Sequence, residues 1–171
     1  MVVLGSLALG IRIAFSMRGR VAALREIERI LSYIEGELRC RRSVLTEALY
    51  NVSVRTPKPY NLWLLELIKI IDSQSNNVDK DEFYEFYYMW TKSLDYLRAN
   101  TLLSSKDISL LSGVGKALGY LDIESQQMNL SLEREHIHSY ILDLDKDVNL
   151  RMKNAIILCF LGGVMTVIAL L

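Results

Sequence analysis

Apolar residues recur every three or four positions through the middle of the chain, a spacing typical of amphipathic helices. The first such helix is predicted from residue 18 to about residue 52. Its apolar stripe loosens at Cys40 and Arg41. Its apolar stripe is Val21, Leu24, Ile27, Leu31, Ile34, Leu38, Leu45 and Ala48. Two prolines, Pro57 and Pro59, end it. No segment of useful length alternates between apolar and polar residues, so the pattern predicts an all-α fold.

Four further helices follow from the same spacing. The second spans about 61–73, the third begins at Asp79, and the fourth begins near Ser104 or Ser105. The fifth begins near Asp122, and because no proline or glycine interrupts it before Gly162, it is predicted to continue as one rod of over forty residues. Short connections between these helices favour an up-and-down antiparallel helical bundle.

Both ends of the chain are strongly apolar. Residues 155–171 contain no charged residue, and their 17 positions would span roughly 25 Å as a helix, against about 30 Å for the hydrocarbon core of a bilayer. Residues 2–11 are equally uncharged, although Arg12 interrupts the run that follows. A buried core helix at the C-terminus and a cleaved signal peptide at the N-terminus are the alternatives. We expect N- and C-terminal transmembrane helices, with a membrane anchor at 1–17, a cytoplasmic helical bundle at 18–154 and a transmembrane helix at 155–171.

Basic residues flank both apolar ends on the side that faces the middle of the chain. They are Arg18, Arg20 and Arg25 after the first segment, and Lys146, Arg151 and Lys153 before the second. Positively charged flanks stay on the cytoplasmic side of a membrane. The sequence therefore predicts a cell-membrane protein whose middle domain is cytoplasmic and which contacts membrane lipids.

The polar residues form no motif of the kind that catalysis or metal binding requires. The 20 basic and 20 acidic residues balance, so nothing in the net charge draws the chain to nucleic acid. His136 and His138 lie two positions apart, on different sides of a helix, and cannot share a metal ion. Cys40 and Cys159 do not suggest a disulfide framework. We expect no enzyme activity, no catalytic residues, no cofactor and no metal site.

One aromatic cluster leaves two interpretations open. Tyr84, Tyr87, Tyr88 and Trp90 lie close together along the third helix. Aromatic residues at helical spacing usually belong to a core. They could instead line a small-molecule pocket, and the chain would then be a regulatory or sensory membrane protein.

Candidate contact residues follow the fourth helix. Gly115 and Gly119 are four positions apart and share a face, which calls for close approach by another helix of the bundle or by a partner. Gly119 could instead end the helix in left-handed geometry. Asp122 would cap the next helix, which leaves the amides of Gln126 and Gln127 available for a partner or merely exposed. These five residues are the candidate partner-binding and assembly site.

Three stretches of this sequence resemble the stage III sporulation protein AB family of endospore-forming bacteria. The first is REIERILSYIEGEL at 25–38, which leads to LTEAL at 45–49. The second, and most specific, is LLSGVGKALGYLDIESQQ at 110–127, and the third is the LGGVMTVIALL tail at 161–171. Lys116 stands where the family pattern has an acidic residue, and Met128 where it has a basic one.

The resemblance implies a function that the residues alone do not give. The family is similar to the cytoplasmic helical domains of inner-membrane platform proteins in type II secretion and type IV pilus systems, which dock a secretion ATPase. It implies a non-enzymatic membrane scaffold of the channel complex between mother cell and forespore. The expected partners are other stage III sporulation proteins including a cytoplasmic ATPase, with a homo-oligomer possible, and the expected location is the mother-cell side of the membrane.

Overall fold

The computed structural model of the chain describes residues 2–41, 45–74, 82–119 and 123–170. These residues form six helices and no strand. The bounds of the helices are α1 Val2–Arg41, α2 Leu45–Arg55, α3 Tyr60–Gln74, α4 Glu82–Asn100, α5 Ser105–Leu118 and α6 Ile123–Leu170. The predicted all-α class is therefore confirmed. The predicted start of the third helix at Asp79 lies outside the described residues.

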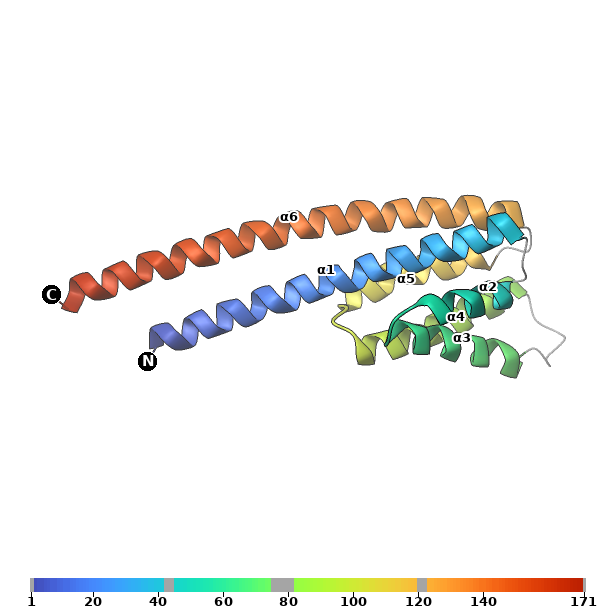
Figure 1. Ribbon diagram of the computed structural model, residues 1–171, viewed down its shortest axis with the longest axis horizontal. Coiled ribbons are helices and arrows are strands. Elements are labelled where there is room, and N and C mark those ends of the chain that lie inside the picture. The colour runs from blue at the N-terminus through green and yellow to red at the C-terminus, as the bar shows by residue number, and fades with distance from the viewer. Residues whose placement is uncertain (1, 42–44, 75–81, 120–122, 171) are drawn as a thin grey trace.

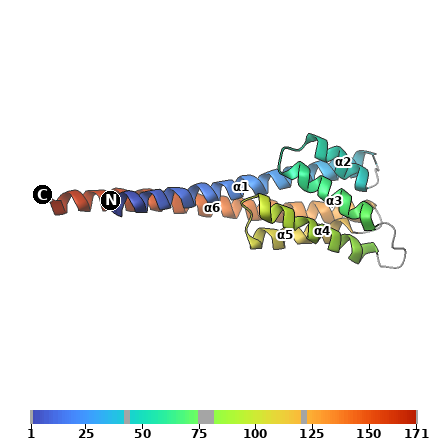
Figure 2. The same ribbon diagram turned by 90° about the horizontal axis from the view of Figure 1, so that it is seen from below.

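Two long helices dominate the architecture. The first, α1, packs mainly against α6, and the two run antiparallel, so that both chain termini lie at the same end of the molecule (Figure 1). The four shorter helices lie beside the other half of this pair, where α2 and α3 form one antiparallel hairpin and α4 and α5 another (Figure 2). Short connections between successive antiparallel helices produce the bundle that the sequence predicts.

The predicted helix at 18–52 is corrected by the structure. The chain instead forms α1, which ends at Arg41, and α2, which begins at Leu45. The end of α1 falls where the apolar stripe loosens beside Cys40. By folding back, α2 buries Ala48, Leu49 and Val52.

The fifth predicted helix is confirmed as one continuous element. The 48 residues of α6 extend from the far end of the bundle to the C-terminal end of the molecule. Among the described residues, no helix combines the length and the apolar character that crossing a membrane requires. The side chains of residues 1–14 and most of those at 155–171 lie outside the described part. Both predicted spans stay predictions.

The core lies where α1 meets the other helices. The predicted stripe of α1 is buried from Val21 to Leu38, and the rings of Trp63 and Trp90 meet edge to face with their centroids 5.3 Å apart. Edge-to-face pairs of this kind stabilise beyond the area they bury. The largest fully buried side chains come from α1, α2, α3 and α4: Trp63, Trp90, Leu24, Ile27, Ile30, Leu31, Ile34, Leu38, Leu49, Leu64, Leu67 and Leu94.

Candidate functional site

The groove predicted at Gly115 is filled from within the bundle. Gly115 is buried in α5, and a Cβ atom built there would lie 2.6 Å from Cδ1 of Trp90. The Trp90 indole also donates a hydrogen bond from Nε1 to the carbonyl of Leu111, at 2.8 Å. Of the two explanations for this glycine, the structure therefore favours close approach by a neighbouring helix, α4.

The second candidate glycine, Gly119, lies at the end of α5 but not in the left-handed geometry considered for it. Gly119 is the C-cap of α5, with φ −76° and ψ −5°, and its N–H donates to the carbonyl of Gly115. These angles are right-handed, so the left-handed cap proposed as an alternative is wrong. Gly119 is buried.

The three remaining candidate residues are not equivalent. Asp122 lies outside the described residues. Gln126 is half-buried and donates from Nε2 to the carbonyl of Leu118, at 3.1 Å, so its amide helps to join α6 to the end of α5. Gln127 is half-buried, and its side chain makes no hydrogen bond to the described part of the chain. Of these candidates, Gln127 is the one whose amide a partner could still use.

The strongest polar cluster was not anticipated from the sequence. The side chain of Asp107 is fully buried and accepts two hydrogen bonds from Arg20, from Nε to Oδ2 at 2.6 Å and from an Nη to Oδ1 at 2.8 Å. Arg20 also donates to the hydroxyl of Tyr140 at 2.7 Å, and that hydroxyl donates to Oδ1 of Asp107 at 3.1 Å. These three residues join α1, α5 and α6 at one place, and we call them the Asp107 network.

Asp107 also fixes the start of α5. Its Oδ2 accepts from the backbone N–H of Ser104 at 2.7 Å, and the Ser104 hydroxyl accepts from the backbone N–H of Asp107, which completes a capping box. A capping box satisfies backbone donors that a helix start leaves without partners. The sequence signal for the capping box was visible, because Ser104 is followed three positions later by an acidic residue. Nothing near Asp107 in the sequence identified Arg20 as the partner of its carboxylate.

The network changes the ionisation of its members. Burial works against a charged Asp107, yet hydrogen bonds from Arg20 and Ser104 and the charge of Arg20 lower the pKa of this carboxyl below its ordinary value. The hydrogen bond to Asp107 raises the pKa of Arg20. Burial and the charge of Asp107 raise the pKa of the Tyr140 phenol. At neutral pH the cluster is therefore a charged pair held by a neutral phenol.

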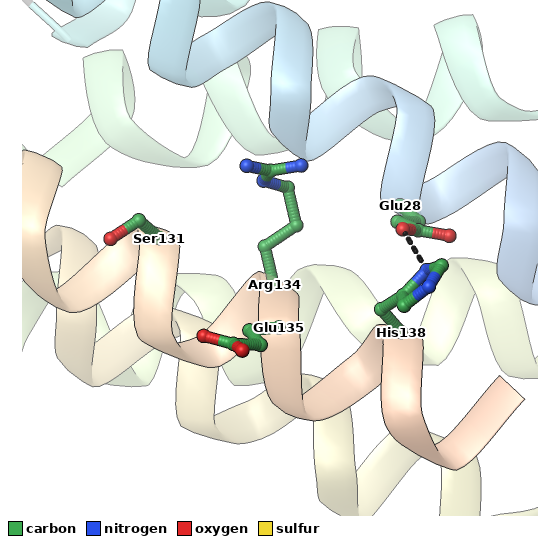
Figure 3. Close-up of a pocket in the computed structure, with 5 residues that line it drawn as sticks. All are labelled: Glu28, Ser131, Arg134, Glu135 and His138. Carbon is green, nitrogen blue, oxygen red and sulfur yellow. Dashed lines mark hydrogen bonds and ion pairs between the residues drawn. The ribbon is translucent and has the colours of Figure 1, made fainter. Parts of the chain in front are cut away.

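A second polar region lies along the contact between α1 and α6. Here an open cavity of about 330 Å³ is lined by Glu28, Ser131, Arg134, Glu135 and His138. Figure 3 shows His138 of α6 directed at Glu28 of α1, and Nδ1 of the imidazole lies 2.7 Å from Oε1 of Glu28. One turn away, Arg134 donates from Nε to Oε2 of Glu35 at 3.0 Å. These interactions join the two long helices.

Neither of these described regions holds a metal-binding cluster. Within the described ranges, no group of three or more His, Cys, Asp or Glu side chains could hold a metal ion. His136 is exposed, and His138 is engaged with Glu28. These contacts join helices, and the hydroxyl of Ser131 donates to the carbonyl of Met128 rather than to His138.

The aromatic cluster of α4 does not converge on one cavity. Trp90 is in the core, Tyr88 is 56% exposed, and the half-buried Tyr87 has the ammonium group of Lys116 5.5 Å from its ring centroid. The side chain of Tyr84 lies outside the described residues. For Trp90, core packing is the correct interpretation of the sequence.

Comparison with known proteins agrees with this fold. A solved structure entitled "Stage III sporulation protein AB" is similar with a TM-score of 0.63 and 19% sequence identity, over 77% of this chain and 97% of that chain. At this identity the similarity shows the fold alone. No curated protein matches the chain. The model of one family, described as stage III sporulation protein AB, matches residues 1–171. The chain therefore belongs to the stage III sporulation protein AB family.

Proposed function

We propose that this chain is a non-enzymatic membrane scaffold in the sporulation channel complex between mother cell and forespore, and that it docks a secretion-type ATPase. The observation that carries the proposal is the match of the family model to residues 1–171. Membership in a stage III sporulation family supports a role beside other proteins of that complex. The resemblance of the family to platform proteins of secretion systems supports the docking of an ATPase.

The arrangement of the long helices supports attachment to a membrane at both ends. The N-terminal half of α1 and the C-terminal half of α6 project from the same end of the bundle (Figure 1). Two predicted apolar segments at this end could enter one membrane while the bundle stays on one side of it. The basic residues next to these segments then favour the cytoplasmic side, which in the family's setting is the mother cell.

The described polar clusters support a structural role. Asp107 receives its hydrogen bonds from Arg20, Tyr140 and Ser104, and the ion pairs of Glu28 and Glu35 are made to α6. Catalytic sites need polar groups that converge on a space for substrate. These groups converge on one another, and their bonds hold helices together.

The proposal is tested by isolating the complex. The full chain carries an affinity tag in sporulating cells, membranes are solubilised, and the co-purifying proteins are identified by mass spectrometry. We expect other stage III sporulation proteins, including an ATPase, at near-stoichiometric amounts. Recovery of the chain from the soluble fraction, or from membranes without these proteins, would contradict the proposal.

The orientation needs a separate measurement. A reporter that is active only in the cytoplasm is inserted between α3 and α4, and a reporter that is active only after export is inserted at the same place. We expect activity from the first reporter alone, because the flanking basic residues hold the bundle in the cytoplasm. Activity of the second reporter would reverse the proposed topology.

A further inference from the structure

One face of α1 is exposed along the whole length of the bundle. Its residues follow one another at alternating intervals of four and three positions, which keeps them on one side of a helix. Every one of them is exposed. We call this face the arginine stripe, and it consists of Arg18, Ala22, Arg25, Arg29, Ser32, Gly36 and Arg39.

No acidic residue lies within the arginine stripe, because the glutamates of α1 lie to either side of it, and all of them except Glu26 pair with residues of other helices. Glu28 pairs with His138 and Glu35 with Arg134, both on α6. On the other side, Glu37 pairs with Arg55 of α2. The packing of the bundle therefore engages three of the four glutamates of α1, whereas four of its arginines lie on the outer face.

The arginines themselves are weakly engaged. Arg18 and Arg39 make no ion pair with the described part of the chain. Arg25 lies 3.1 Å from Asp145, and both side chains are substantially exposed, at 56% and 38%. Arg29 pairs with Glu26 of its own helix. Exposed pairs of this kind contribute little to stability, so carboxylates of a partner can replace them.

No contact with the described part of the chain requires a glycine at position 36. Gly36 lies inside α1, where glycine is disfavoured relative to alanine, and a Cβ atom built there would meet nothing within 4 Å. Gly115, by contrast, is required by Trp90. Ala22, Ser32 and Gly36 have small side chains or none, so the surface between the arginines lies close to the backbone of α1. The space that these small residues leave open fits a second backbone that approaches α1 closely.

We propose that the arginine stripe docks an acidic helical segment of a partner protein. Four exposed guanidinium groups, two of which make no ion pair with the described part of the chain, complement such a segment in charge. Arginine also pairs with carboxylates in a bidentate way. The inference rests on the proposed function, because a platform needs a surface on which a partner docks, and it assigns that surface to the outer face of α1.

The geometry disfavours two other occupants. From Arg18 to Arg39 the stripe extends roughly 30 Å along α1, at 1.5 Å per residue, and it leads away from the end that carries both termini. A bilayer at that end would meet only the beginning of the stripe. A second copy that presented the same face would set arginines against arginines, which is unfavourable.

Charge reversal tests the proposal in the intact chain. Arg25→Glu together with Arg29→Glu replaces the parent chain in sporulating cells, and the tagged membrane complex is quantified. The matched control is Lys69→Glu with Lys92→Glu, which reverses two exposed charges on α3 and α4. We expect at least a tenfold loss of partner proteins with the arginine variant and less than a twofold change with the control, at melting temperatures close to that of the parent.

The outcomes separate this inference from the proposed function. If the arginine variant assembles as well as the parent, the stripe is not the docking surface, although the chain remains a platform. If both variants lose the partners equally, the effect is one of net charge and the stripe is again rejected. If the parent chain itself enters no complex, the proposed function fails and this inference fails with it.

A second variant tests the close approach without changing charge. Gly36→Leu should fold normally, because the space at Gly36 is open, yet its side chain should reduce recovery of the partner at least tenfold. A photo-crosslinking residue at Ser32 then identifies the occupant in cells. Cross-links to an acidic segment of another protein support the proposal, whereas cross-links only to lipid, only to a second copy, or to nothing overturn it.

Discussion

The indole of Trp90 occupies the place where any residue other than glycine at position 115 would put its side chain. A Cβ atom at Gly115 would lie 2.6 Å from Cδ1 and 2.7 Å from Cγ of this ring. The ring has little freedom to move, because its Nε1 donates a hydrogen bond to the carbonyl of Leu111 and the ring packs edge to face with Trp63. The contact therefore fixes how closely α4 and α5 approach.

Gly115→Ala should destabilise the chain. Overpacking a rigid core costs about 1–3 kcal/mol, which exceeds the gain of up to about 1 kcal/mol that alanine brings to a helix. Chemical denaturation of the purified full chain, followed by tryptophan fluorescence, measures the difference. An unchanged or increased free energy of unfolding would show that Trp90 can move aside.

Gly36→Ala is the matched control and should have the opposite sign. The same substitution in α1 meets nothing within 4 Å, so only the helix preference for alanine remains. We expect the free energy of unfolding to rise by about 0.5–1 kcal/mol. A decrease would mean that this face of α1 is covered in the purified chain.

Asp107→Asn should be among the more damaging substitutions of a single polar group. The amide cannot accept all the hydrogen bonds that the carboxylate receives from Arg20, Tyr140 and Ser104, and Arg20 keeps its charge in a half-buried position. Removing one partner of a buried ion pair costs about 3–5 kcal/mol. Asp143→Asn, at a carboxylate with an exposed pair to Lys146, should change stability by less than about 1 kcal/mol.

The lowered pKa of Asp107 should make the stability of the chain depend on pH. Because the pKa of Asp107 is lowered in the folded chain, its contribution is complete above the unfolded pKa of about 3.9 and is lost as the pH falls through the folded pKa. The difference in unfolding free energy between the parent chain and Asp107→Asn should therefore shrink below about pH 4. A difference that stays constant between pH 6 and pH 3 would contradict the lowered pKa.

The two glutamines of α6 should respond differently to alanine. Gln126→Ala removes the hydrogen bond to the Leu118 carbonyl and should cost about 1 kcal/mol of stability. Gln127→Ala should leave the melting temperature nearly unchanged while reducing recovery of the sporulation complex. If complex recovery is normal in a stably folded Gln127→Ala chain, that residue is no part of the assembly site.

Local patterns in the sequence predicted most of the helices and their buried faces. Periodicity alone identified Leu24 and Leu31 as core residues, because the residues on the buried face of a helix recur at intervals of three and four positions. The start of α5 was also predictable, since Ser104 and Asp107 cap it within one turn. The reversal between α1 and α2 was not, because neither proline nor glycine marks it.

Interactions between distant residues could not be predicted in the same way. Arg20 and Asp107 are 87 positions apart, and nothing near either residue indicates its partner. The sequence was interpreted as placing Arg20 and Arg25 beside a membrane segment as flanking charges. In the structure they form ion pairs with Asp107 and Asp145. The close approach at Gly115 was predicted, but its partner Trp90 emerged only from the packing of α4 on α5.

The continuity of α6 has a mechanical consequence. Its 48 residues make a rod of roughly 72 Å, at 1.5 Å per residue, and no proline provides a hinge along it. Force applied to the bundle, whether a pull along the axis or a twist about it, would travel through this rod to the C-terminal end with little loss to bending. If the chain docks an ATPase as proposed, such a strut would transmit the working stroke of that motor as well as hold it in place.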